Sequence, residues 1–223
     1  MKNPKGRFDL VAFDVDGTLV EHPQGKTVWD VLNHRYTGRE DVNEERSRLY
    51  RANRLSYEEW VALDIESWRR AGATRRDLVA AFEPLTLVPG ARETLSILKE
   101  KGARLAVISG TLDLLLDTLF PDHPFDEVHT NQISFDENGS ISGHRATTFD
   151  MDGKAVALRS IALHQRIPLL RCAFVGDNDN DIPAARVAGF AIAFNPKSPD
   201  FEAVAHAVVR SPDLRDILPH LLS

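Results

Sequence analysis

Two carboxylates stand at the end of the first apolar segment of the chain, where the motif DVDGT spans residues 14–18. The preceding residues 10–13 are apolar and β-prone, which predicts a buried strand of a parallel sheet. Ligands of open α/β sheets collect at the carboxyl ends of such strands. We therefore predict that Asp14 and Asp16 belong to a site for metal and phosphate chemistry, although the motif alone is also typical of structural turns.

Three further segments end in residues that phosphoryl transfer can use. Residues 172–175 are apolar and run into GDNDND at 176–181, a second cluster of carboxylates. Residues 106–108 run into Ser109, and Lys154 follows a glycine at the start of a helical pattern. A set of oxygen ligands without histidine or cysteine favours Mg²⁺ over zinc. The chain thus holds, in order, an acid pair, a serine, a lysine and an acid cluster.

A phosphate monoester can approach a carboxylate only if its negative charge is offset. At roughly 4 Å and an effective dielectric of 20, like unit charges repel by about 4 kcal/mol, and a dianion doubles this to about 8 kcal/mol. A divalent cation and Lys154 together can cancel that repulsion. Asp14 is then the candidate nucleophile, forming an aspartyl-phosphate that water hydrolyses. Asp16 is the candidate general acid and later base.

The order of the four motifs resembles that of the haloacid-dehalogenase superfamily, and most nearly its phosphoserine-phosphatase-like branch. The resemblance covers nearly the whole chain and includes FNPK at residues 194–197. It implies the same catalytic roles for Asp14 and Asp16. It also implies that the metal is held by Asp14, the backbone carbonyl of Asp16 and Asp177, with Asp181 supporting that shell.

The candidate phosphate-binding residues lie in or beside these motifs, and they are Thr18, Ser109, Gly110, Lys154 and Asn180. A hydroxyl and free backbone N–H groups at a helix start can hold phosphate oxygens, but a serine there is often only an N-cap. A lysine in a first helical turn is ordinarily solvated and opposes the helix dipole, so its presence favours a function. The motif DMDG at 150–153 is interpreted as a helix-capping turn, because residues 147–149 make a poor buried strand.

Strand patterns vanish between the first motif and about residue 85, and a charged, helical pattern takes their place. We predict a helical cap domain at 21–85, inserted into an α/β core formed by 1–20 and 86–223. Beyond residue 89 helical patterns at 91–101, 112–119, 154–164 and 182–187 alternate with strand patterns at 104–108, 172–175 and 191–194. Asn-Gly at 138–139 indicates a hairpin. The expected fold class is therefore α/β, with a doubly wound, mostly parallel sheet.

A carboxylate interrupts the apolar face of a cap helix predicted to start near Tyr57. Positions 57, 60, 61, 65 and 68 form one stripe, and Asp64 projects into its middle. Because an unpaired buried carboxylate is costly, we expect Asp64 either to pair with a core-domain cation or to face the active-site cleft. In the second case Trp60 and Trp68 would flank a cationic group of the substrate. Phosphoserine phosphatases tend to carry an arginine at the comparable position, so Asp64 departs from their pattern.

Size and composition narrow the class of protein. The 223 residues, 43% hydrophobic and 27% charged, suffice for one domain with an insertion. A net charge of −6 argues against a nucleic-acid partner. We find no apolar segment of membrane-spanning length and no signal-peptide pattern, and therefore expect no membrane partner. The single Cys172 excludes a disulfide within the chain, which fits a reducing cytoplasm.

The sequence thus predicts a cytoplasmic, Mg²⁺-dependent phosphomonoesterase acting on a small soluble phosphate ester. Phosphoserine and related amino or hydroxy metabolites form the nearest substrate class. Two alternatives stay open: a phosphotransferase that passes the phosphoryl group to a second metabolite, and a catalytically silent binding protein on the same fold. The sequence leaves the oligomeric state open.

Overall fold

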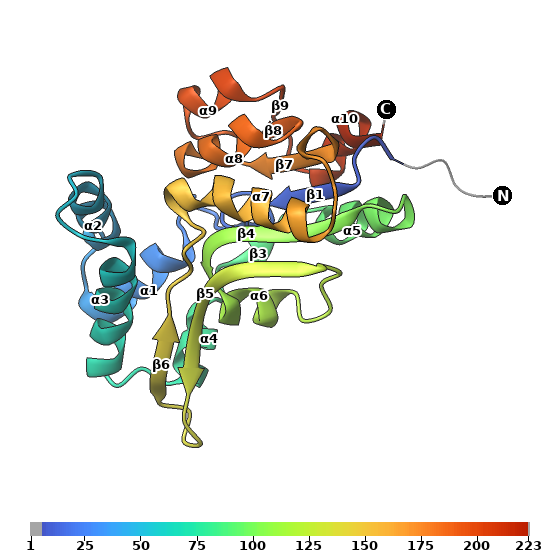
Figure 1. Cartoon of the computed structure of the whole chain (residues 1–223). Coiled ribbons are helices and arrows are strands. Elements are labelled where there is room, and N and C mark those ends of the chain that lie inside the picture. Colours follow the sequence, from blue (N-terminus) through green and yellow to red (C-terminus); the bar gives the residue numbers. More distant parts are fainter. Residues whose placement is uncertain (1–5, 223) are drawn as a thin grey trace.

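The computed structural model describes residues 6–222, and its centre is a seven-stranded sheet in the order β6-β5-β4-β1-β7-β8-β9 (Figure 1). Every neighbouring pair is parallel except β5 and β6, which form the predicted hairpin. The strands are β1 (Leu10–Phe13), β4 (Arg104–Leu112), β5 (Glu127–Phe135), β6 (Ile141–Arg145), β7 (Cys172–Gly176), β8 (Phe190–Phe194) and β9 (Ala207–Val209). Residues 1–5 and 223, assigned to the core domain from the sequence, lie outside the described residues.

Helices cover both faces of the sheet, because alternate residues of each central strand point to opposite sides. Val11 and Phe13 of β1 join the apolar cluster of one face, whereas Leu10 and Ala12 join that of the other. The first face is covered by α5 (Ala91–Glu100), α6 (Asp113–Leu119) and α10 (Leu218–Leu222). The second face is covered by α7 (Lys154–His164), α8 (Ile182–Val187) and α9 (Pro199–Val204). The predicted doubly wound, mostly parallel α/β fold is confirmed.

Short 3₁₀ segments connect several of these elements. They are Met151–Gly153, Leu169–Arg171, Asp179–Asp181 and Leu214–Ile217. The strand predicted at 104–108 is longer than expected, since β4 continues to Leu112 and α6 begins only at Asp113. Ser109 therefore lies within the extended end of a strand and not at a helix start.

A helical insert, defined here as residues 21–85, leaves the sheet after β1 and lies beyond the carboxyl ends of the strands (Figure 1). Its helices are α1 (Val28–Thr37), α2 (Val42–Arg51), α3 (Tyr57–Arg70) and α4 (Arg75–Ala81). Two short strands pair antiparallel where the insert departs and returns, β2 (Val20–Glu21) with β3 (Thr86–Leu87). The sequence indicated no strand between the first motif and about residue 85, because a two-residue strand carries no periodic pattern.

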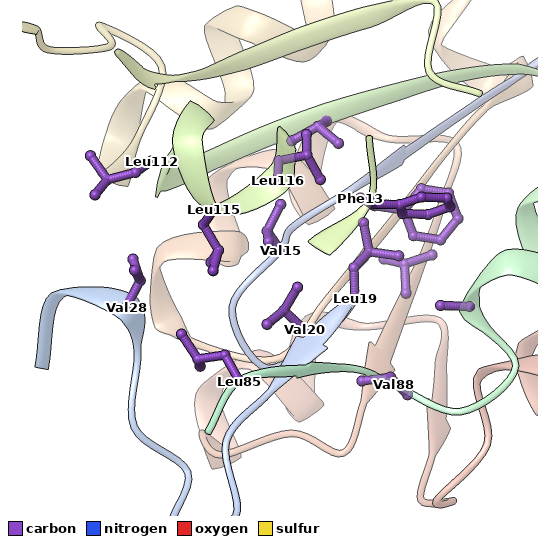
Figure 2. Close-up of a cluster of buried hydrophobic side chains, with 14 of the residues drawn as sticks. Phe13, Val15, Leu19, Val20, Val28, Leu85, Val88, Leu112, Leu115 and Leu116 are labelled. Atoms are coloured by element: carbon purple, nitrogen blue, oxygen red, sulfur yellow. The ribbon is translucent and has the colours of Figure 1, made fainter. Parts of the chain in front are cut away.

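The turn after β1 packs against buried apolar side chains. Figure 2 shows Val15, which separates the two motif aspartates, among side chains of the turn and of α6 such as Leu19 and Leu115. All three are fully buried. Because closely packed interiors resist displacement, this cluster fixes the backbone that carries Asp14 and Asp16. Within residues 6–222, no helix is long and apolar enough to cross a membrane.

Candidate active site

Three buried carboxylates meet at the carboxyl ends of β1 and β7. The two strands are neighbours with Phe13 opposite Val175, and the backbone N–H of Asp14 donates to the Val175 carbonyl at 2.9 Å. One carboxylate oxygen from each of Asp14, Asp177 and Asp181 lies within 4.8 Å of the others. The sheet topology thus brings together residues that lie more than 160 positions apart in the sequence.

Lys154 bridges two of these carboxylates. Its Nζ atom lies 2.8 Å from Asp14 Oδ1 and 2.7 Å from Asp181 Oδ1, and the side chain is fully buried. Burial lowers the pKa of Lys154, but the charges of Asp14, Asp181 and Asp150 outweigh it and hold this pKa well above its usual range. The ordinary alternative, a solvated lysine in a first helical turn, is wrong for this residue.

The carboxylate cluster fits a divalent cation. Both Asp177 side-chain oxygens are buried; among the described residues Oδ1 has no partner, whereas Oδ2 pairs with Lys197 Nζ at 2.9 Å. Burial, opposed by Lys197 and reinforced by Asp14, raises the pKa of Asp177 to about 6. Burial also raises the pKa of Asp181 to about 7, against the effect of Lys154. A bound cation would offset this excess of negative charge, and an all-oxygen donor set suits a hard cation.

Gly17 allows the first turn to approach this cluster. Its φ is +89°, a conformation that favours glycine, and a Cβ atom at this position would collide with the Asp177 carboxylate. The glycine of the DVDGT motif is therefore required by both backbone conformation and space.

Asp16 lies beside the cluster and is held by the helical insert. The backbone N–H of Val28, at the start of α1, donates to Asp16 Oδ1 at 3.0 Å. Burial and the neighbouring Asp14 charge raise the pKa of Asp16 to about 6. A carboxyl group with a pKa near neutrality can donate a proton and later accept one, which suits general acid–base chemistry.

Ser109 and Gly110 lie near the end of β4, the other neighbour of β1, and side chains from two further elements contact Gly110. The Ser109 hydroxyl accepts a hydrogen bond from the Thr111 N–H at 3.2 Å, and the N-cap of α6 is Leu112. The capping alternative for Ser109 is therefore wrong. The Gly110 carbonyl accepts hydrogen bonds from Trp29 Nε1 at 2.8 Å and from Asn131 Nδ2 at 2.6 Å.

These groups open onto a cleft of about 1440 Å³ between the sheet and the helical insert. Of the predicted catalytic, metal and phosphate residues, those that line it are Asp14, Asp16, Ser109, Gly110, Asp177 and Asn180. Lys154 contacts Asp14 and Asp181, and neither Lys154 nor Asp181 has exposed surface. The Thr18 hydroxyl is buried, has no hydrogen-bond partner within residues 6–222, and does not border the cleft.

The specificity residues predicted from the sequence lie differently from expectation. Asp64 pairs with Arg46 of α2, so its cation belongs to the helical insert and not to the core domain, and although Asp64 borders the cleft its side chain has no solvent-exposed surface. Trp68 is also fully buried, and its Nε1 donates to Asn33 Oδ1 at 2.9 Å. It does not border the cleft, so it cannot flank a substrate. Trp60 and Asp64 both border the cleft, and of the three residues only Trp60 keeps partial exposure.

The comparisons with known proteins agree with this geometry. Residues 8–189 match the family model described as haloacid dehalogenase-like hydrolase. The chain belongs to this hydrolase family. It is similar to the phosphoserine phosphatase of Idiomarina loihiensis, with 30% identity over 98% of this chain and 94% of the relative. It is 33% identical, over 94% of its length, to phosphoserine phosphatase SerB2 of Mycobacterium tuberculosis, but spans only 49% of that protein.

Solved structures place this hydrolase in the phosphoserine-phosphatase-like branch. A structure described as a phospho-aspartyl intermediate analogue of phosphoserine phosphatase superposes with a TM-score of 0.76 and 26% identity, covering 98% of this chain and 99% of that one. A substrate-bound phosphoserine phosphatase complex gives a TM-score of 0.73 at 25% identity, covering 99% of each chain.

Three site residues of this hydrolase were missed in the sequence: Asp150, Tyr57 and Lys197, whose Nζ pairs with Asp177 Oδ2. Asp150 was interpreted as part of a capping turn, but its side chain makes no capping hydrogen bond. Instead Asn180 Nδ2 donates to Asp150 Oδ1 at 3.2 Å, and Asp150 packs against Gly110. Tyr57 of α3 reaches the same place, where its hydroxyl accepts a hydrogen bond from Asn131 Nδ2 at 2.8 Å. The repeated Asp-x-Asp-Gly pattern could have indicated a functional role for Asp150. No pattern in the sequence predicts the contact between Tyr57 and Asn131.

Proposed function

We propose that this hydrolase is a Mg²⁺-dependent phosphomonoesterase that works through an aspartyl-phosphate on Asp14. The observation that carries the proposal is the position of Lys154 Nζ, 2.8 Å from Asp14 and 2.7 Å from Asp181, next to the unpartnered Asp177 Oδ1. One cation and one set of oxygen ligands thus adjoin the candidate nucleophile. This is the charge distribution that the transfer of a dianionic phosphoryl group requires.

In this proposal a carboxylate oxygen of Asp14 bonds to phosphorus while the bond from phosphorus to the ester oxygen breaks. Asp16 gives its proton to the departing oxygen, and in the second half takes a proton from the water that attacks the aspartyl-phosphate. The bond from phosphorus to the Asp14 oxygen then breaks, inorganic phosphate leaves, Asp16 is protonated again and Asp14 is regenerated. The hydrogen bond from Val28 to Asp16 Oδ1 keeps this carboxyl group in place for both proton transfers.

Asp14, the Asp16 backbone carbonyl and Asp177 would hold Mg²⁺, supported by Asp181. When bound, the ion supplies positive charge to the phosphoryl oxygens and helps to align the transfer. Asn180 and the Ser109–Gly110 segment would bind the phosphoryl oxygens from the cleft, and Lys154 would offset their charge from below. We retain Thr18 as a phosphate-binding candidate only through its backbone, because its side chain is buried.

The relatives named phosphoserine phosphatases support phosphoserine and related amino or hydroxy esters as the substrate class. We propose that the helical insert, residues 21–85, acts as a cap domain that covers the ester and selects its leaving group. Of the predicted specificity residues, we retain Trp60 for this role. We also propose a cytoplasmic location, which suits the buried free thiol of Cys172.

Hydrolysis of p-nitrophenyl phosphate by the purified protein tests this function. We expect turnover that requires Mg²⁺, stops with EDTA and returns when Mg²⁺ is added in excess. Nitrophenol and inorganic phosphate should appear in equal amounts. A phosphate yield that falls below the nitrophenol yield when alcohols are added would indicate a phosphotransferase. Absence of turnover in folded, Mg²⁺-loaded protein would leave the catalytically silent alternative.

A further inference from the structure

Three aromatic side chains of the helical insert contact one another at the wall of the cleft. The ring centroids of Tyr50 and Tyr57 lie 6.4 Å apart with an interplanar angle of 80°, and Trp60 lies 6.2 Å from each. Its ring plane is inclined by 49° to that of Tyr50 and by 65° to that of Tyr57. All three line the same cleft as Asp14 and Asp16. We call these three residues the aromatic cluster.

Two carboxylates outside the metal set accompany the aromatic cluster. Asp150 and Asp152 line the same cleft, and within residues 6–222 neither forms an ion pair with a lysine or arginine. The Asp150 carboxylate adjoins Tyr57, because a Cβ atom added at Gly110 would meet both Asp150 Oδ2 and the Tyr57 hydroxyl oxygen. Burial raises the pKa of Tyr50, and the charges of Asp152 and Asp150 raise it further. The wall therefore combines π faces with negative charge.

The rings of the aromatic cluster make no cation–π contact with a lysine or arginine among the described residues, although Arg48, Arg51 and Arg54 line the same cleft. Among the described residues, cation–π contacts involve only the rings of Phe8, Phe190, Tyr36 and Phe120, and none involves the aromatic cluster. Clustered aromatic faces beside carboxylates attract ammonium groups, both through the ring quadrupoles and through charge.

The aromatic cluster also lies close to the reacting group. The Tyr57 hydroxyl accepts a hydrogen bond from Asn131 Nδ2, and the same Nδ2 donates to the Gly110 carbonyl next to Ser109. A cation bound there would be separated from the phosphoryl group by only a short linker. This geometry favours a short spacer between the ester oxygen and the positive charge.

We propose that the leaving group of the substrate carries an alkylammonium ion, bound by Tyr50, Tyr57 and Trp60 together with Asp150 and Asp152. The substrate is then a phosphorylated amino alcohol whose nitrogen lies a few bonds from the ester oxygen. This inference rests on the proposed phosphomonoesterase function and names its substrate class. The competing feature is a group of arginines, Arg48, Arg51 and Arg54, which also line the cleft and would favour an anionic leaving group.

Three esters of similar size distinguish these possibilities: phosphoethanolamine, neutral glycerol 3-phosphate and anionic phosphoglycolate. We expect kcat/KM in saturating Mg²⁺ to be at least tenfold higher for phosphoethanolamine than for either of the others. Equal values for phosphoethanolamine and glycerol 3-phosphate, or a preference for phosphoglycolate, would overturn the proposal. Turnover of p-nitrophenyl phosphate in parallel separates the two failures, because its absence would refute the phosphomonoesterase function itself.

Variants locate the preference on the aromatic cluster. Trp60→Leu keeps an apolar side chain but removes the π face, and should lower the ratio of kcat/KM for phosphoethanolamine over glycerol 3-phosphate about three- to thirtyfold. Trp60→Phe should restore most of that ratio. Asp152→Asn changes only an exposed side chain and should also lower this ratio.

The matched control is Leu63→Ala, which lies on the same helix as Trp60, is 48% exposed and lies outside the cleft. An unchanged ratio in both Trp60→Leu and Asp152→Asn would refute the assignment.

Discussion

At the scale of single residues, the candidate site depends on the ion pairs between three buried carboxylates and two lysines. Asp14 and Asp181 both contact Lys154, while Asp177 contacts Lys197 through one oxygen only. Lys154 thus neutralises part of the charge that would repel a phosphate dianion from Asp14. A positive side chain fixed before substrate binds needs no reorganisation during the reaction, which is the main source of its catalytic value.

Replacing this lysine tests its role at the same scale. Lys154→Met should lower kcat/KM for every phosphate ester alike, because the phosphoryl group is common to all of them. It should also reduce the free energy of unfolding by about 3–5 kcal/mol, since it leaves buried carboxylates unpaired. Steady-state kinetics on two esters and thermal denaturation measure both effects. Ser109→Ala should give a milder uniform loss of activity.

The matched control for this variant is Arg159→Met, an exposed cation on the same helix α7 that lies outside the cleft. It should leave both activity and stability near those of the wild type. A loss confined to one leaving group in Lys154→Met would contradict a phosphate-handling role and place this residue in substrate selection.

At the scale of elements, the helical insert is held together by an ion pair between α2 and α3. Asp64 is fully buried and pairs with Arg46, which keeps 17% of its side chain exposed. Asp64 therefore stabilises the packing of α2 against α3, the two helices that present the aromatic cluster to the cleft.

Breaking this pair should loosen the insert without changing specificity. Asp64→Asn leaves the Arg46 guanidinium without its carboxylate and should lower the free energy of unfolding by about 3–5 kcal/mol. Activity on all esters should fall together. The double variant Arg46→Asp/Asp64→Arg, which exchanges the two charges, should recover part of the stability. A changed ratio between phosphoserine and phosphoethanolamine in a folded Asp64→Asn variant would contradict this view and restore a direct role in specificity.

The comparison of sequence and structure is most instructive for these helices. The helix start near Tyr57 was predictable, because Ser56 and Glu59 form a capping box there. The stripe also predicted that Asp64 would point inward. Its partner was not predictable, because Arg46 lies in a different helix and helix–helix packing is not encoded in local spacing. The same limit applies to Trp68, which packs against Trp29 with ring centroids 5.3 Å apart instead of facing the cleft.

At the scale of the whole molecule, the alternation of strands and helices predicted the sheet, and the sheet accounts for most of the site. Parallel strands end at one edge, so residues at the carboxyl ends of β1, β4 and β7 converge without any local signal for their contact. The position of Asp150 could not be predicted from this alternation, because it depends on the path of the loop before α7. The structure places this carboxylate against Gly110 and Asn180.

Metal binding should stabilise the whole fold, because the unfolded chain does not hold its three carboxylates together. At a Mg²⁺ concentration about 100 times the dissociation constant, the free energy of unfolding should rise by about 2.7 kcal/mol. Thermal denaturation with and without Mg²⁺ measures this change as a shift in Tm. Asp177→Asn should reduce the shift, whereas Asp200→Asn, an exposed carboxylate on α9, should preserve it. A greater affinity for zinc than for Mg²⁺ would contradict the assignment of the metal.

The most direct measurement is the position of the phosphoryl group during turnover. Protein mixed with excess p-nitrophenyl phosphate and Mg²⁺ is quenched in acid, digested and examined by mass spectrometry. We predict a phosphoryl group on Asp14 in the wild type and none in Asp14→Asn, whose rate should fall at least about 10²- to 10⁴-fold with unchanged circular dichroism. A phosphoryl group on another residue, or near wild-type turnover in folded Asp14→Asn protein, would contradict the proposed mechanism.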